Sequence, residues 1–164
     1  MVHAQLNINY MVGVLILLFS IFALFAAYFI QYVLGHKPCN LCLFERLPYF
    51  FSIIIISICL FTQKFEKITL IILSLIFFIA ALLSFYHFGI EQGFIKESLV
   101  CDLNSQNNDL SKEALLNQLK EMPVSCKNVT FKVFGLSLAT FNIFISLILG
   151  AITMKLFLYY EKNR

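Results

Sequence analysis

The stretch KPCNLCLFER, residues 37–46, stands between two long apolar runs and carries two cysteines, a glutamate and an arginine. The run before it covers about residues 10–34, and the run after it about residues 43–61. A segment of roughly 20 apolar residues is long enough to cross the hydrocarbon core of a bilayer. The stretch therefore marks a water–lipid boundary, and its reactive side chains need an explanation at that place.

The composition points to a membrane protein. Of the 164 residues, 60% are hydrophobic and 13% are charged, and the mean hydropathy is +0.87. A soluble domain of this length would need more polar surface. The formal net charge of +3 is too small and too dispersed to indicate a nucleic-acid binder. The sequence also lacks a Gly-rich phosphate loop, a Ser/His/Asp pattern and an internal repeat.

Two further apolar runs, at about residues 68–90 and 134–159, bring the number of expected spans to four. We therefore predict an all-α fold, an integral membrane four-helix bundle that forms a single domain over residues 1–164. Two extracytoplasmic loops, at about residues 35–42 and 91–133, would join the spans. We expect the first run to be a retained span, because no Lys or Arg precedes it and its apolar core is too long for a signal peptide.

The orientation follows from basic residues and cysteines. The short basic turn at residues 63–67 and the basic tail after residue 154 favour a cytoplasmic location for that end of the bundle. Four of the five cysteines fall on the opposite side, where disulfides persist. We therefore expect cytoplasmic termini and cysteine loops on the extracytoplasmic side. In the long loop, residues 109–122 have helical spacing; this helix would lie on the membrane surface or pack on its neighbours.

The two cysteine pairs admit several kinds of chemistry. Cys39 and Cys42 form a C-x-x-C, which occurs in zinc half-sites, redox pairs and structural bridges. Cys101 and Cys126 have 24 residues between them, a spacing that fits zinc poorly, so we expect no metal. A structural bridge between Cys101 and Cys126 would contribute about 3 kcal/mol, whereas one between Cys39 and Cys42 would stabilise little. Cys59 is expected to be a buried small hydrophobe.

The residues around Cys39 and Cys42 fit a redox pair better than a zinc site or a structural bridge. Cys42 opens the predicted second helix, where free backbone N–H groups favour an anion. Arg46 follows one turn later on the same face, so a thiolate at Cys42 would have two sources of positive potential. Glu45 would pair with Arg46 or hold it in place. The alternative for Arg46 is a snorkelling interfacial cation.

The residues PCNLCLFER at positions 38–46 resemble the PCxLCxxER signature of the DsbB family, bacterial inner-membrane proteins that drive disulfide formation. The order of the four spans, the loop with Cys101 and Cys126, and FGLSL at residues 134–138 add to the resemblance over nearly the whole chain. His87 resembles a family histidine near the quinone, or else is an interfacial hydrogen-bonder, and Glu91 and Gln92 are weaker candidates. Residues 138–141, LATF, depart from the family's usual Met-Pro-x-Trp. The resemblance therefore does not assign the residues of the quinone pocket on the fourth span.

The resemblance implies an electron path. A reduced DsbA-type thioredoxin-fold partner would attack the Cys101–Cys126 disulfide at Cys101, and an interloop bridge between Cys39 and Cys126 would pass the electrons on. Cys42, beside Arg46, would then reduce ubiquinone or menaquinone, with Glu45 and His87 near the quinone. DsbA is strongly oxidising at about −120 mV, so only a better oxidant such as a quinone can recharge it.

Other functions fit less of the sequence. A relative of vitamin K epoxide reductase would carry its cysteine pairs in the reverse order. A specialised DsbB paralogue with one dedicated partner remains open. A non-enzymatic four-helix scaffold with two structural disulfides leaves Arg46 and the C-x-x-C without a purpose. A channel or transporter would place charged or broken helices at mid-membrane, and these spans offer almost none.

Overall fold

The computed structural model describes residues 2–62, 66–96, 126–127, 132–133 and 135–162. Four of its helical segments are long and apolar enough to cross a membrane: residues 10–32, 40–62, 66–91 and 138–162. The predicted all-α, four-span membrane fold is thus confirmed, and the chain is a multi-pass membrane protein. The predicted helix at residues 109–122 lies outside the described residues.

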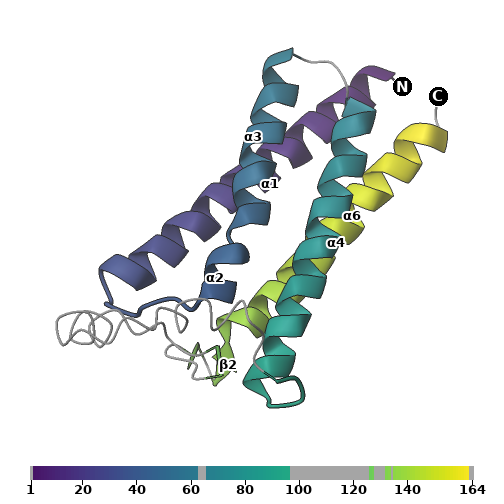
Figure 1. The fold of residues 1–164 in the computed structure, drawn as a ribbon. Coiled ribbons are helices and arrows are strands. Elements are labelled where there is room, and N and C mark those ends of the chain that lie inside the picture. The colour runs from purple at the N-terminus through teal and green to yellow at the C-terminus, as the bar shows by residue number, and fades with distance from the viewer. Residues whose placement is uncertain (1, 63–65, 97–125, 128–131, 134, 163–164) are drawn as a thin grey trace, which may run out of the picture.

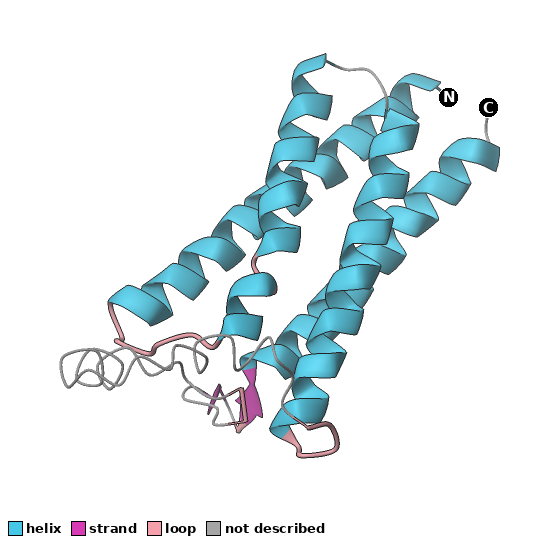
Figure 2. Cartoon of the chain, in the orientation of Figure 1, coloured by secondary structure: helices cyan, strands magenta, loops and turns pink. Residues whose placement is uncertain are grey.

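The helices are arranged so that both termini, the end of α3 and the start of α4 lie at one end of the bundle (Figure 1). α1 covers Val2–Tyr32, α3 Leu47–Thr62, α4 Glu66–Glu91 and α6 Leu138–Lys162. α1 packs on α3, and α4 packs on α6 and α3. The short helix α2, Asn40–Phe44, lies at the opposite end together with the hairpin of β1 and β2 (Figure 2).

The second span is not the continuous helix that the sequence predicted. α2 ends at Phe44 and α3 begins at Leu47, so Glu45 and Arg46 form a break. Pro48 explains it, because a proline cannot donate to the carbonyl of Phe44 and its ring collides with that carbonyl. The chain instead tightens, with Arg46 N donating to Leu43 O at 3.1 Å. Because of the break, the side chains of Glu45 and Arg46 point in directions that a continuous helix would not give them.

The last span begins later than residue 134, where the sequence placed it. β1 (Lys132–Val133) and β2 (Leu136–Ser137) form an antiparallel pair. Gly135, between them, has a φ of 83°, which favours glycine. Ser137 then caps α6, because its Oγ accepts a hydrogen bond from Thr140 N at 3.3 Å.

The helix interfaces are made from small side chains. Ser20, Ser52, Ser84, Ser146 and Thr153 are each 0% exposed. Several of these hydroxyls donate to the carbonyl one turn earlier in their own helix, as Ser20 Oγ does to Ile16 O at 2.8 Å. Small residues let membrane helices approach closely. Large apolar side chains such as Phe77 and Leu73 are also buried in the core. Many others face outward, as expected for a lipid-facing surface; Phe22, Phe25, Leu82, Phe85 and Phe144 are each more than 60% exposed.

Candidate active site

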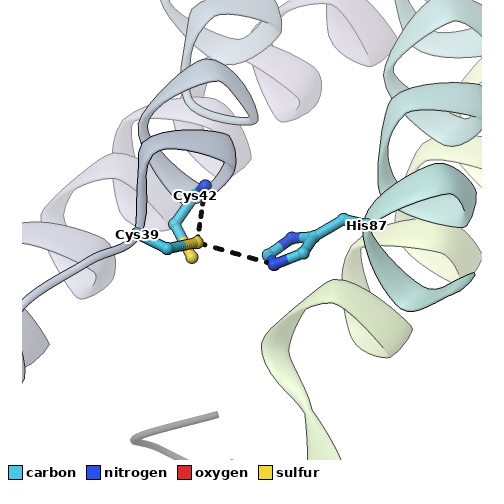
Figure 3. A group of neighbouring side chains, drawn as sticks. All are labelled: Cys39, Cys42 and His87. Carbon is cyan, nitrogen blue, oxygen red and sulfur yellow. Dashed lines mark hydrogen bonds between the residues drawn. The ribbon is translucent and has the colours of Figure 1, made fainter. Parts of the chain in front are cut away.

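The C-x-x-C motif folds around its first sulfur. Cys39 is the N-cap of α2, and its Sγ accepts a hydrogen bond from Cys42 N at 3.2 Å (Figure 3). The helix thus begins at Asn40, two residues before the Cys42 that the sequence assigned, and the capping sulfur belongs to Cys39. Both cysteines carry free thiols; Cys39 is buried and Cys42 is half-buried.

His87 of α4 faces the first sulfur. Its Nε2 lies 3.5 Å from Cys39 Sγ (Figure 3), and its Nδ1 lies 2.8 Å from Glu45 Oε1. Because an ionised carboxylate only accepts hydrogen bonds, Nδ1 carries a hydrogen and donates it to Glu45. The ring is therefore held between Glu45 and Cys39, and it is 2% exposed.

The surroundings of Cys39 favour its thiolate. Its pKa is lowered to about 5, first by the hydrogen bond from the Cys42 side chain. Burial opposes this shift, while the hydrogen bond and charge of His87 and the backbone N–H of Cys42 add to it. A thiolate is the nucleophile in disulfide exchange. In the reduced pair, Cys39 is therefore the sulfur that these contacts favour as an anion.

A buried polar network continues from Glu45 into the bundle. Asn142 of α6 donates from Nδ2 to Glu45 Oε2 at 3.4 Å and to Ser84 Oγ at 2.7 Å. Its Oδ1 accepts hydrogen bonds from Tyr49 and, at 3.4 Å, from Ser146. The sequence analysis missed this network. An asparagine inside an apolar run was the signal that could have found it, because intramembrane polar residues need partners.

A cavity of about 350 Å³ adjoins the site. α1 lines it on one side, with Phe22 among its residues, and α6 lines it on the other, with Phe141 and Ile145. Its polar lining comprises residues of the redox motif and their neighbours: Gln31, His36, Lys37, Cys39, Cys42, Glu45, Arg46, Tyr49, His87, Glu91, Cys126 and Asn142. The cavity therefore offers apolar walls together with reactive sulfurs.

Arg46 and Glu45 both line this cavity, but they are not paired with each other. Arg46 Nη1 donates to Gln31 Oε1 at 2.7 Å, and its guanidinium lies 4.9 Å from the centre of the Tyr28 ring. Glu45 bonds His87 and Asn142 instead. The expectation that Glu45 pairs with Arg46 or holds it is wrong, because the break before α3 directs the two side chains to different helices. Within the described residues, the Arg46 guanidinium thus contacts Gln31 and Tyr28 of α1 and not the Cys42 sulfur.

The remaining cysteines separate into two groups. Cys126 is buried and disulfide-bonded, and it packs in one apolar cluster with Cys39, Leu41 and Ile90. Cys101 lies outside the described residues. Cys59 is a free thiol in α3, half-buried rather than fully buried. The structure thus brings Cys39, Cys42 and Cys126 to one place and leaves Cys59 apart from the cavity lining.

Two further groups complete the site. Glu91 Oε1 lies 3.6 Å from His87 Nε2, and the Glu91 side chain is 5% exposed. Gln92, the next residue, is exposed. The ligand atoms of Cys39, Cys42 and His87 all lie within 4.8 Å of one another, a spacing that suits a metal ion as well as thiol chemistry.

The chain is similar to known proteins over most of its length. A family model described as "Disulfide bond formation protein DsbB" matches residues 9–156, which include all five cysteines and His87. An uncharacterized protein of Rickettsia prowazekii (strain Madrid E), RP370, is 29% identical over 168 residues, with 97% of each chain covered. No solved structure matches the chain.

Proposed function

Because the chain belongs to the DsbB family of disulfide bond formation proteins, we propose that it reoxidises a DsbA-type thiol oxidase and passes the electrons to a membrane quinone. The family makes it an oxidoreductase of disulfide formation. The partner and the acceptor are the proposal. The observation that carries it is the position of the C-x-x-C sulfurs and Cys126 on one cavity whose other walls are lipid-spanning helices.

The thiol exchange proceeds by attack of thiolates on disulfides. A partner thiolate attacks Cys101 of the Cys101–Cys126 disulfide, forms a mixed disulfide and releases the Cys126 thiolate. Cys126 attacks Cys39 of the Cys39–Cys42 disulfide and releases Cys42. The partner's second thiol then displaces Cys101, which attacks Cys126 and restores the loop disulfide. Two electrons have moved from the partner to Cys39 and Cys42, which end as free thiols.

Contacts in the described chain support this order. Cys126 belongs to the same buried cluster as Cys39 and lines the same cavity, which brings the two cysteines to one part of the bundle. The lowered pKa of Cys39 favours it as a leaving thiolate, because a thiol of low pKa leaves faster.

The cavity suits a quinone. When bound, a quinone supplies an acceptor for two electrons and two protons. Phe22, Phe141 and Ile145 are the apolar residues that would hold its ring and tail. Arg46 is the cation that would face a quinone oxygen, and His87 the ring that would exchange a proton with Cys39, 3.5 Å away. Glu45 positions His87 through the 2.8 Å hydrogen bond to Nδ1.

The orientation is part of the proposal. We place the bundle end with α2, the hairpin and Cys126 in the periplasm, where a disulfide persists. The other end, with both termini, would then lie in the cytoplasm (Figure 1). Lys67 and Lys162 belong to that end, as the positive-inside rule favours.

The test mixes the purified chain with a reduced DsbA-type protein and a short-chain ubiquinone or menaquinone, and follows quinone absorbance. Cys42→Ser should abolish turnover, and Arg46→Ala should weaken it. Cys59→Ser is the matched control, because this thiol does not line the cavity, and it should turn over like the wild type. If neither quinone is consumed while the disulfides of the chain stay intact, a structural scaffold is the better explanation.

A further inference from the structure

The thiols of Cys39 and Cys42 meet a third metal-binding side chain that the linear sequence does not reveal. The spacing of the two cysteine pairs argued against zinc, but His87 comes from α4, 48 positions away from Cys39. Its Nε2 and the two sulfurs lie within 4.8 Å of one another (Figure 3). Two thiolates and an imidazole are ligands that zinc prefers.

The distances match a tetrahedral centre. Zinc bonds of about 2.3 Å to sulfur and about 2.0–2.1 Å to nitrogen imply an S···N edge of about 3.5 Å and an S···S edge of about 3.8 Å. The separation of Cys39 Sγ and His87 Nε2 is 3.5 Å. The Cys42 sulfur lies within 4.8 Å of both atoms, a limit that includes these tetrahedral edge lengths.

The far side of the imidazole is arranged as in metal sites. A zinc-bound histidine usually donates its other N–H to a carboxylate, which fixes the tautomer and the ring orientation. His87 Nδ1 lies 2.8 Å from Glu45 Oε1, and Asn142 in turn donates to Glu45 Oε2 at 3.4 Å. The Nε2 lone pair is thereby directed at the sulfurs.

Glu91 is the carboxylate next to His87 in this three-ligand group. Its Oε1 lies 3.6 Å from His87 Nε2, and its side chain is 5% exposed. Within the described part of the chain its Oε2 is buried and has no hydrogen-bond partner. A buried carboxylate oxygen without a partner is costly, and coordination of a cation would satisfy it. None of the disulfide-exchange steps uses this residue.

We propose that the reduced chain binds Zn²⁺ through Cys39, Cys42 and His87, with Glu91 as the fourth ligand, and that the bound ion holds the pair in the dithiolate state. Binding releases the thiol protons and moves no electrons. Oxidation of the pair to a disulfide removes two of the ligands, so coordination and disulfide formation exclude each other. Binding of Zn²⁺ to the reduced chain is independent of the function proposed above. Only the expectation that bound Zn²⁺ inhibits quinone turnover rests on that function.

Co²⁺ is the spectroscopic probe, because thiolate coordination gives it a charge-transfer band. The reduced wild-type chain should show this band, and Zn²⁺ should displace it. Cys39→Ser, Cys42→Ser and His87→Asn should each weaken binding at least tenfold, and Glu45→Gln about 10–100-fold through ring orientation. Cys59→Ser is the matched control that should bind like the wild type. Circular dichroism checks the helix content of each variant.

An unsubstituted control guards against misfolded variants. Wild-type chain oxidised with diamide should show no band, and Zn²⁺ should slow the oxidation of Cys39 and Cys42 by diamide at least tenfold. Absence of a band in the reduced chain, or equal affinity of His87→Asn and wild type, would overturn the proposed site. If quinone turnover is absent while the band and the protection persist, the proposed function fails and the metal site stands.

Discussion

Asn142 is the residue at which the stability of the polar network is best tested. The substitution Asn142→Leu keeps the approximate volume and removes both ends of the amide. It deletes two donated hydrogen bonds, to Ser84 Oγ and Glu45 Oε2, and two accepted ones, from Tyr49 and Ser146. Each of these partners belongs to the buried core of the bundle, so water does not replace the lost contacts.

The expected loss can be worked from these bonds. Hydrogen bonds between membrane helices contribute about 0.6 kcal/mol each on average, so the loss of all the Asn142 bonds should destabilise the bundle by about 2 kcal/mol. Ser84→Ala removes one of them and should cost about 0.6 kcal/mol. Phe144→Leu changes a side chain of α6 that is 62% exposed to lipid, and it should change stability by less than about 0.5 kcal/mol.

Reversible unfolding in mixed micelles, followed by circular dichroism, measures the three variants against the wild type. The order of destabilisation should be Asn142→Leu, then Ser84→Ala, then Phe144→Leu. If Asn142→Leu is no more destabilising than Ser84→Ala, the network is not a set of separate contributing bonds and the reasoning fails. Quinone turnover of Asn142→Leu should also fall, because Glu45 loses a support for its position against His87.

Three other predictions concern ionisation, the cavity cation and helix packing. The alkylation rate of Cys39, followed by mass spectrometry, should level off above about pH 6, because its pKa is lowered to about 5; a rate that climbs until about pH 9 would contradict this. Since the folded-state pKa lies below the ordinary value, ionisation stabilises the reduced fold at neutral pH, and that stabilisation is lost as the pH falls through about 5. Arg46→Ala should lower kcat/KM for quinone about 10–150-fold, since a charged hydrogen bond contributes about 1.5–3 kcal/mol. Arg46→Lys should be intermediate because it keeps the charge without the planar fork that bonds Gln31; equal rates for the three proteins would count against a role for this cation. Gly150→Ala should change the unfolding free energy by less than about 1 kcal/mol, because the added Cβ meets Phe78 at an ordinary 3.6 Å. Gly150→Leu should cost about 1–3 kcal/mol through overpacking of α4 against α6, and the same unfolding assay would reject this if the two variants were alike.

Much of the site was visible in the sequence because it is local. Cys39, Cys42, Glu45 and Arg46 fall within one short motif at a span boundary, so their proximity followed from chain connectivity. The boundaries of the spans were less accurate. The break that Pro48 causes and the hairpin and Ser137 cap before α6 were not expected from the sequence. The redox helix was expected to open at Cys42, whereas it begins at Asn40 with Cys39 as its N-cap.

The contacts of the charged motif residues could not be assigned in the same way. Glu45 bonds His87 and Asn142 and does not bond Arg46. These contacts depend on how α4 and α6 are rotated about their axes. Likewise, Arg46 bonds Gln31 of α1, a residue 15 positions earlier in the chain. These pairings are set by helix packing and not by sequence spacing.

The sequence by itself determined that this chain is a membrane bundle of four spans with cysteines at one boundary, because span length is matched to the bilayer and disulfide chemistry to one side of it. Only the tertiary structure decided which buried groups meet. Glu45 joins His87 across 42 positions and Asn142 across 97. The spans are apolar nearly all round, so no amphipathic pattern tells which face turns inward. Small residues and shape complementarity set that rotation, and with it the partners of the redox pair.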